Sequence, residues 1–238
     1  QHAYHAGGPA DLPKHQVLVA LLRALTRKKR AVSYLEPHAG RGLYDLTGPD
    51  AAKTRDAAEG FSAWEAAHGG LPKGPYGDAL RAVRRAYGAG AYPGSPLLAR
   101  ALLRVDDRMA LFELHPAEYT ALEDVFTDCL IPGPEPLIEK RDGAEGAAAR
   151  TPPDARRGLV LIDPSYEVKT EYADTAKLAL NIITRWPEAM IAIWYPILSA
   201  GREAELLQGI SGLQPLLFER SFVLKDGQGM TGAGVAVL

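Results

Sequence analysis

The sequence lacks several features that define common protein classes. Cys129 is the single cysteine among 238 residues, which excludes an internal disulfide and a zinc site built from cysteines. No apolar run approaches the roughly 20 residues that span a bilayer, and no signal peptide is visible. His5, His15, His38 and His115 are too scattered to predict a metal cluster. Hydrophobic residues make up 47% of the chain, which argues against disorder. With these absences, we expect a folded, cytoplasmic protein without a metal or a membrane.

The chain also lacks a strong excess of either charge, because its formal net charge is −2. Its basic residues are nevertheless clustered. The clusters are Arg23, Arg27, Lys28, Lys29 and Arg30, then Arg81, Arg84 and Arg85, then Arg156 and Arg157. Clusters of this kind can bind phosphates. The alternative is that cations near the ends of helices offset the helix dipole.

Apolar runs and helical patterns alternate along most of the chain. We expect strands at residues 32–35, 109–114, 137–140, 158–162 and 189–195, with a closing hairpin at 218–224 and 234–238. Helices are expected at 12–25 after an N-cap Asp11, at 97–103 with Ser95 as N-cap after a loop at 92–96, and at 117–128, 172–186 and 202–209. Residues 144–153 look like a linker. This alternation predicts an α/β fold with a mostly parallel sheet and helices on both faces.

One segment interrupts this alternation. Residues 47–90 are rich in alanine, glycine and charge, and contain helical patches at 51–68 and 76–87. We expect them to form a small helical insertion, with residues 1–46 and 91–238 forming the main domain.

The residues that directly follow each strand are the expected ligand-binding residues, because open parallel sheets bind ligands at the carboxyl ends of their strands. Gly40 and Gly42 lie in a turn after the first strand, and Glu113 follows the second. Asp142 follows the third strand and Asp163 the fourth. Each feature has a plainer explanation, namely a tight turn or a helix cap. Together they suit a nucleoside-bearing cofactor that has no phosphate.

The segment Asp163 to Tyr166, DPSY, resembles the D-P-P-Y signature of S-adenosylmethionine-dependent adenine-N6 methyltransferases. The wider chain is similar to the RlmJ-type methyltransferases, which act on an adenine of large-subunit ribosomal RNA. The matching stretches are YHAGGPADLPKH (4–15), PHAGRGLYDL (37–46), YPGSPLLARALLR (92–104), ELHPAEY (113–119), RRGLVLIDPSYEVKTEY (156–172), WYPI (194–197) and GMTGAG (229–234). The chain departs from the family at Ser165, where the second proline stands, and at Gly8 and Pro9 in the N-terminal motif.

The resemblance implies a class I methyltransferase fold with a helical insertion after the first strand. It also implies a cytoplasmic monomer that binds S-adenosylmethionine and methylates protein-free ribosomal RNA. The implied cofactor-binding residues are Lys14, His15, His38, Gly40, Ser95, Glu113, Asp142, Gly143 and Asp163, and no metal is required.

The catalytic residues expected are Asp163, Pro164 and Tyr166. The carboxylate of Asp163 and the carbonyl of Pro164 can accept both N–H groups of an adenine amine, and Tyr166 can stack on the base. The alternative is that Asp163 caps the next helix and that Tyr166 is a core residue.

The second basic cluster, Arg81, Arg84 and Arg85, is expected to bind RNA phosphates. Two other functions remain open: the same chemistry on DNA or another RNA, and a methyltransferase-like protein that binds RNA or cofactor without turnover.

Overall fold

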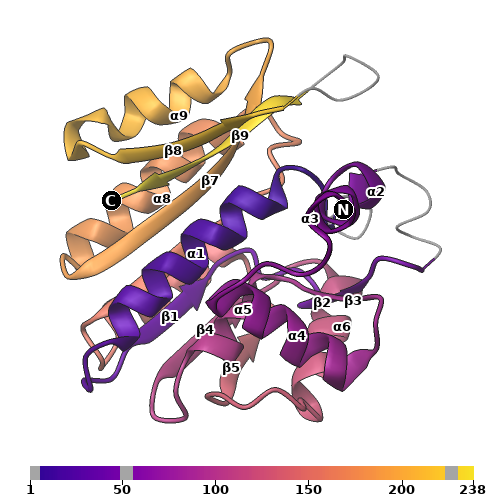
Figure 1. The fold of residues 1–238 in the computed structure, drawn as a ribbon. Coiled ribbons are helices and arrows are strands. Elements are labelled where there is room, and N and C mark those ends of the chain that lie inside the picture. Colours follow the sequence, from indigo (N-terminus) through magenta and orange to yellow (C-terminus); the bar gives the residue numbers. More distant parts are fainter. Residues whose placement is uncertain (1–5, 49–55, 223–229) are drawn as a thin grey trace.

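The computed structural model describes residues 6–48, 56–222 and 230–238 (Figure 1). Its main sheet has the strand order β5-β4-β1-β6-β7-β9-β8. The strands are β1 (Ser33–Glu36), β4 (Arg108–Phe112), β5 (Pro136–Glu139), β6 (Gly158–Ile162), β7 (Ala189–Leu198), β8 (Leu216–Ser221) and β9 (Met230–Val237). Strands β5, β4, β1, β6 and β7 pair in parallel, whereas β9 is antiparallel to both β7 and β8. The predicted mostly parallel sheet with a closing hairpin is therefore confirmed.

Helices cover both faces of the sheet, because the strands bury side chains on both sides. In β6, Leu159 and Leu161 belong to one apolar cluster and Val160 and Ile162 to the other. The first face carries α1 (Asp11–Thr26), α5 (Ser95–Leu102) and α6 (Pro116–Thr127). The second carries α7 (Gly143–Arg150), α8 (Glu171–Arg185) and α9 (Glu203–Ile210). In the ranges described, no helix is both long and apolar enough to cross a membrane.

A two-stranded ribbon supports the inserted helices. Strands β2 (Leu43–Asp45) and β3 (Ala91–Pro93) pair in an antiparallel manner, and α2 (Asp56–Glu59), α3 (Phe61–His68) and α4 (Pro75–Tyr87) lie between them in the sequence. Arg84 of α4 donates two hydrogen bonds to Glu65 of α3, at 2.7 and 2.8 Å. The insertion thus begins and ends at one ribbon, although its independence as a subdomain stays a prediction.

Some local predictions were wrong. Residues 144–153 are not a linker, since residues up to Arg150 belong to α7, whose N-cap Asp142 accepts a hydrogen bond from Glu145 N. The small residues there serve packing: a Cβ on Gly146 would lie 2.2 Å from Phe112. The expected loop at 92–96 contains strand β3, which pairs with β2.

Two predicted helix caps were also wrong. Ser95 is inside α5, whose N-cap is Gly94. Asp11 lies in the first turn of α1, after the N-cap Ala10. Predictions for residues 1–5, 49–55, 223–224 and 229 fall outside the described residues.

Candidate active site

The candidate site lies where the chain reverses its direction of travel across the sheet. From β1 the chain continues to β4 on one side, whereas β6 lies on the other side of β1. The carboxyl ends of β1 and β6 are adjacent, and such a switch point is the usual ligand site of an open α/β sheet. Glu36 ends β1 and Asp163 follows β6 directly.

Asp163 is held in a buried ion pair with the first helix. Its carboxylate is 2% exposed, and Lys14 Nζ lies 2.8 Å from Asp163 Oδ2 and 2.9 Å from Asp11 Oδ1. Asp11 in turn accepts a hydrogen bond of 2.7 Å from Gly7 N. Burial alone would lower the pKa of Lys14, but the two carboxylates outweigh burial and raise its pKa above the usual value. Lys14 is therefore a fixed cation beside Asp163 at neutral pH.

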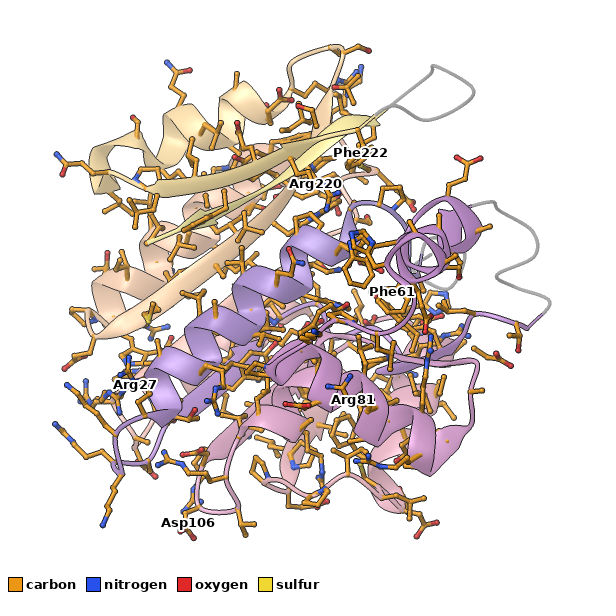
Figure 2. All side chains as sticks on the ribbon, viewed as in Figure 1. Arg27, Phe61, Arg81, Asp106, Arg220 and Phe222 are labelled. Carbon is orange, nitrogen blue, oxygen red and sulfur yellow. The ribbon has the colours of Figure 1, made fainter. Side chains whose placement is uncertain are left out.

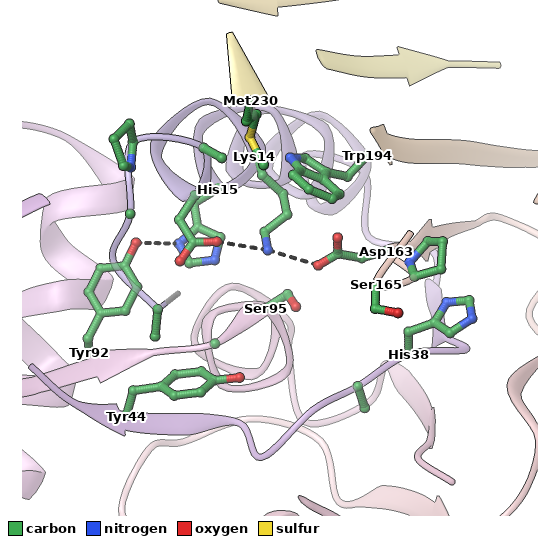
Figure 3. A pocket seen from close by; sticks show the side chains of 18 of the residues that line it. Lys14, His15, His38, Tyr44, Tyr92, Ser95, Asp163, Ser165, Trp194 and Met230 are labelled. Carbon is green, nitrogen blue, oxygen red and sulfur yellow. Dashed lines mark hydrogen bonds and ion pairs between the residues drawn. The ribbon is translucent and has the colours of Figure 1, made fainter. Parts of the chain in front are cut away.

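A pocket of about 240 Å³ lies beside this ion pair (Figure 3). We call it the aromatic pocket. Its lining residues are Ala6, Gly8, Pro9, Ala10, Asp11, Lys14, His15, His38, Ala39, Tyr44, Tyr92, Gly94, Ser95, Asp163, Pro164, Ser165, Glu167, Trp194, Phe222 and Met230. Lys14 Nζ lies 5.8 Å from the centroid of the Trp194 ring, so the indole is next to both the cation and Asp163.

The inner wall of the aromatic pocket is fixed by packed aromatic side chains. His15 is 1% exposed, and its Nδ1 lies 3.2 Å from the Tyr92 hydroxyl and 3.3 Å from that of Tyr76. The rings of His15 and Tyr92 stack with their centroids 5.5 Å apart. Tyr44 and Tyr92 are on the ribbon strands β2 and β3, so the ribbon that supports the insertion also supplies a wall of this pocket.

A second pocket of about 430 Å³ opens along the carboxyl ends of β1, β4 and β5. We call it the acidic pocket. Its lining residues are Pro37, His38, Gly40, Glu113, Leu114, His115, Glu118, Asp142, Gly143, Asp163, Ser165, Glu167 and Glu171. Carboxylates dominate this wall, which makes it unfavourable for phosphate groups and favourable for a cation.

The backbone around the acidic pocket is tightly fitted. Glu113 accepts hydrogen bonds from Gly40 N and from His115 N, both 2.8 Å long. Gly40 has a φ of 61°, which favours glycine. A Cβ on Gly143 would lie 1.9 Å from Pro37 O, so the start of α7 packs directly on the loop after β1.

The two pockets share His38, Asp163, Ser165 and Glu167. A ligand in the acidic pocket and a ligand in the aromatic pocket would therefore meet beside Asp163. This arrangement suits the transfer of a group between two bound molecules.

A buried carboxyl group lies beneath the site. Glu36 is fully buried and accepts hydrogen bonds from the hydroxyls of Tyr34, at 2.7 Å, and of Ser95. Burial raises the pKa of Glu36 to about 8, although the two hydroxyls and Lys14 act to lower it. Sequence reasoning gave Glu36 no role, because its partner Ser95 is 59 residues away along the chain.

Most of the residues expected from the sequence do come together. Lys14, His15, Ser95 and Pro164 line the aromatic pocket, and Gly40, Glu113, Asp142 and Gly143 line the acidic pocket, while His38 and Asp163 line both. Asp142 is also the N-cap of α7. Within the part of the chain that the structure describes, no group of three or more His, Cys, Asp or Glu side chains is arranged to hold a metal ion.

Tyr166 is not where the sequence placed it. Its ring is 9% exposed, lines neither pocket and lies 4.5 Å from the ring of Tyr172 between centroids. Its hydroxyl donates a hydrogen bond of 2.8 Å to Trp194 O. Tyr166 is therefore a core residue that fixes the backbone of Trp194, and Trp194 is the aromatic residue of the pocket that lies beside Lys14 and Asp163. The stretch WYPI had included Trp194 without assigning it a role.

The second basic cluster divides into side chains with different contacts. Arg84 is partly buried in its pair with Glu65 and lies over the ring of Phe61 at 5.7 Å. Arg81 pairs with Asp78 at 2.6 Å on the surface, where the partner is 71% exposed. Arg85 is exposed. Arg84 thus joins α3 to α4, and the other two are accessible to a ligand.

Comparisons with known proteins agree with this geometry. The family described as ribosomal RNA large subunit methyltransferase D, RlmJ, matches residues 29–238. Ribosomal RNA large subunit methyltransferase J of Escherichia coli K12 is 33% identical, and that of Haemophilus influenzae is 34% identical, each over 100% of this chain and 85% of the relative. The crystal structure of protein LPL1258 from Legionella pneumophila superposes with a TM-score of 0.86 at 31% identity, covering 98% of this chain and 86% of that one.

A more distant solved structure supports the fold alone. The methyltransferase domain of METTL16 superposes with a TM-score of 0.51 at 9% identity, over 96% of this chain and 67% of that one. The sheet order, the two pockets that meet at Asp163, and the match of sequence over nearly the whole chain point the same way. The chain belongs to the RlmJ family of ribosomal RNA large subunit methyltransferases.

Proposed function

We propose that this protein transfers a methyl group from S-adenosylmethionine to the N6 amine of an adenine in large-subunit ribosomal RNA. The observation that carries this proposal is the position of Asp163 on the border between the acidic and the aromatic pocket. The family supports the reaction class, and the named relatives support the RNA substrate.

The acidic pocket fits the cofactor. S-adenosylmethionine carries a positive sulfonium and no phosphate, and the wall offers carboxylates, among them Glu113, Asp142 and Asp163. A carboxylate has about four lone-pair positions, so Glu113 can hold Gly40 N and His115 N and still accept from ribose hydroxyls. Asp142 is exposed beside the close backbone contact of Gly143 and can accept from a nucleobase amine. When bound, the cofactor supplies an activated methyl group.

The aromatic pocket fits the target base. Asp163 and the carbonyl of Pro164 can each accept one N–H of the adenine amine, which leaves the nitrogen lone pair directed at the methyl donor. The proline ring restricts the backbone φ, so the Pro164 carbonyl is held in place before the base arrives. Trp194 can stack on the base, a contact worth about 1–3 kcal/mol, in the role that the sequence had given to Tyr166.

Lys14 is proposed to position the catalytic carboxylate. Its ammonium group holds Asp163 Oδ2 at 2.8 Å and keeps the carboxylate ionised, since a fixed neighbouring cation favours the charged form. An ionised carboxylate accepts hydrogen bonds from the amine, whereas a protonated one would also present a donor. The pair therefore sets both the orientation and the charge of Asp163.

RNA outside the target base is proposed to contact the insertion. Arg81 and Arg85 are accessible on α4, whereas Arg84 holds α3 and α4 together. The target adenine must leave its base stack to reach Asp163, which costs free energy, and contacts between nearby cations and the surrounding phosphates can offset that cost.

We further propose that the protein acts as a monomer, that it methylates ribosomal RNA before ribosomal proteins cover it, and that it does so in the cytoplasm.

The test is methyl transfer from tritiated S-adenosylmethionine to protein-free large-subunit ribosomal RNA, to assembled large subunits and to DNA. N6-methyladenosine in the digested RNA is the expected product, and Asp163→Asn should abolish it while leaving cofactor binding largely intact, since Glu113 and Asp142 remain in the acidic pocket. Preferred methylation of DNA would support the alternative substrate. Cofactor binding without turnover on any substrate would support a non-catalytic protein, for which Ser165 in place of proline is the one motive in the sequence.

A further inference from the structure

The edge of the sheet opposite the active site carries a dense group of exposed cations. Arg27, Lys28, Lys29 and Arg30 form the loop between α1 and β1, and Arg156 lies in the loop before β6. Since β1 and β6 are parallel neighbours, the two loops enter the sheet side by side. We call these five residues the basic end.

Helix α1 links the active site to the basic end. Its 16 residues extend about 24 Å. In Figure 2, Arg27 lies at the opposite end of α1 from Phe222, which lines the aromatic pocket. The exposed side chains along α1 include Gln16, Ala20, Arg23 and Arg27, a stripe without a carboxylate. Beyond Asp11 in its first turn, α1 itself carries no carboxylate between the pocket and the basic end.

Two other arginines, Arg104 and Arg157, hold the backbone at this edge through hydrogen bonds. Arg104 donates hydrogen bonds to Lys28 O at 2.8 Å and to Arg30 O at 2.9 Å, and Arg157 donates one to Leu25 O at 2.8 Å. These bonds hold the backbone of the loop. Within residues 6–48, 56–222 and 230–238, no hydrogen bond or ion pair engages the side chains of the basic end, which therefore point their charges at solvent on a fixed loop.

The helix dipole does not account for this cluster. Arg27 is the C-cap of α1, and the next three cations follow the helix, beyond the last turn in which the dipole acts. Consecutive like charges repel one another. Acids in the loops before β4 and β6 compensate only part of this charge: Asp107 is paired with Arg104, which leaves the exposed Asp106 and Asp154 against the five cations of the basic end.

We infer that the basic end is a second RNA-binding surface, which holds the phosphate backbone of the ribosomal RNA outside the segment that enters the active site. The inference rests on the proposed RNA substrate. The separation along α1, about 24 Å, is short beside the roughly 16 base pairs of A-form stem that one small RNA-binding domain can span, so a single stem can contact both places. Affinity from this surface depends on charge and not on base sequence.

The test compares two variants that remove the same charge. Lys28→Gln/Lys29→Gln alters the basic end, and Lys177→Gln/Arg202→Gln alters exposed cations at α8 and beside the start of α9. Binding and turnover are measured with the full-length large-subunit ribosomal RNA transcript across a salt series, and with the shortest hairpin of that RNA that the unaltered protein still methylates. Cofactor affinity and melting temperature are recorded for every protein.

With the full transcript, Lys28→Gln/Lys29→Gln should raise KM at least about fivefold and leave kcat unchanged. The log–log salt slope should fall by roughly 1.4 to 1.8, the value for two lost phosphate contacts. On the short hairpin the variant should match the unaltered protein, and the control variant should match it on both RNAs.

Equal KM values and equal salt slopes for the two variants on the full transcript would overturn the inference. Binding to vesicles containing phosphatidylserine is measured as well. If Lys28→Gln/Lys29→Gln loses vesicle binding while its RNA binding is unchanged, the partner is a membrane and the inference is also overturned. If the unaltered protein methylates no ribosomal RNA at all, the proposed function fails. If it methylates the RNA and the variants do not differ, only this inference fails.

Discussion

Replacing Lys14 by methionine should destabilise the protein far more than its single lost charge suggests. Lys14 Nζ lies 2.8 Å from Asp163 and 2.9 Å from Asp11, and its side chain is 6% exposed. At an effective dielectric constant of about 20, one such contact is worth about 6 kcal/mol before desolvation is subtracted. Removing one partner leaves a buried carboxylate without compensation, so we expect a loss of about 3–5 kcal/mol in the free energy of unfolding at pH 7.

The measurement is urea unfolding in a double-mutant cycle with Asp163→Asn. The neutral amide leaves no buried charge, so Lys14→Met/Asp163→Asn should be more stable than the sum of the two single losses predicts. An uncompensated buried carboxylate also binds a proton more readily, and the loss in Lys14→Met should therefore shrink as the pH falls from 7 to 5. Lys177→Met is the control: Lys177 pairs with Asp174 at 3.0 Å but is 74% exposed, and we expect a change below about 1 kcal/mol.

Two outcomes would refute this reasoning. The first is a loss below about 1 kcal/mol for Lys14→Met, which would mean that water replaces the ammonium group without cost. The second is additivity of the two substitutions within about 0.5 kcal/mol, which would mean that Lys14 and Asp163 are not coupled.

Three further predictions concern single side chains around the site. Glu113→Ala should weaken S-adenosylmethionine binding by about 1.5–3 kcal/mol in calorimetry, and an unchanged dissociation constant would place Glu113 outside the cofactor site. Glu36→Gln should flatten the pH dependence of the free energy of unfolding. Because folding raises the pKa of Glu36 to about 8, the folded protein loses stability as the pH rises from about 5 to 8, whereas the amide of the variant has no proton to lose. Parallel stability curves for the two proteins would contradict the raised pKa. Trp194→Ala should lower kcat/KM about 5- to 150-fold, the equivalent of about 1–3 kcal/mol, with cofactor affinity unchanged. Trp64 of α3, which stacks on Phe61 and lines neither pocket, is the control, and an equal loss in Trp64→Ala would argue against stacking on the base.

The strand-end carboxylates were predictable from sequence because a parallel sheet brings the ends of its strands to one edge. A buried strand can be recognised from its apolar run, and the residue after it is then known. Glu113, Asp142 and Asp163 were located in this way, and the structure places all three in the acidic pocket. The argument needs only that these strands run parallel, which follows from the alternation of strands and helices.

Side-chain direction after the strand was not predictable by the same argument. Tyr166 has a φ of 54°, a left-handed backbone that turns its ring into the core, where Tyr172 packs against it. Trp194 reaches the pocket because it follows Ile193, the last residue of β7 that pairs with β6, and it lies opposite Val235 of β9. Neither fact is visible in a pattern of residue types, since each depends on contacts between segments far apart in the chain.

Helix α7 was missed for a related reason. Its sequence, GAEGAAAR, contains two glycines that favour a linker when propensity alone is considered. Both glycines instead allow close packing: Gly143 against the carbonyl of Pro37 and Gly146 against the ring of Phe112. A glycine that is required for close packing can be recognised only when the neighbouring group that packs against it is known.

The formal net charge of −2 is compatible with the two ligands that the chain is proposed to bind, which carry opposite charges. A sulfonium cofactor requires carboxylates, an RNA backbone requires cations, and one surface cannot attract both. The structure separates them: the carboxylates face the acidic pocket, whereas exposed cations gather on α4 and at the basic end of α1. Lys14 is the exception, a cation inside the site, and its charge is balanced there by Asp11 and Asp163. The net charge of a protein therefore does not indicate nucleic-acid binding when its carboxylates and its cations bind different ligands. The positions of the charges in the structure are then more informative than their sum.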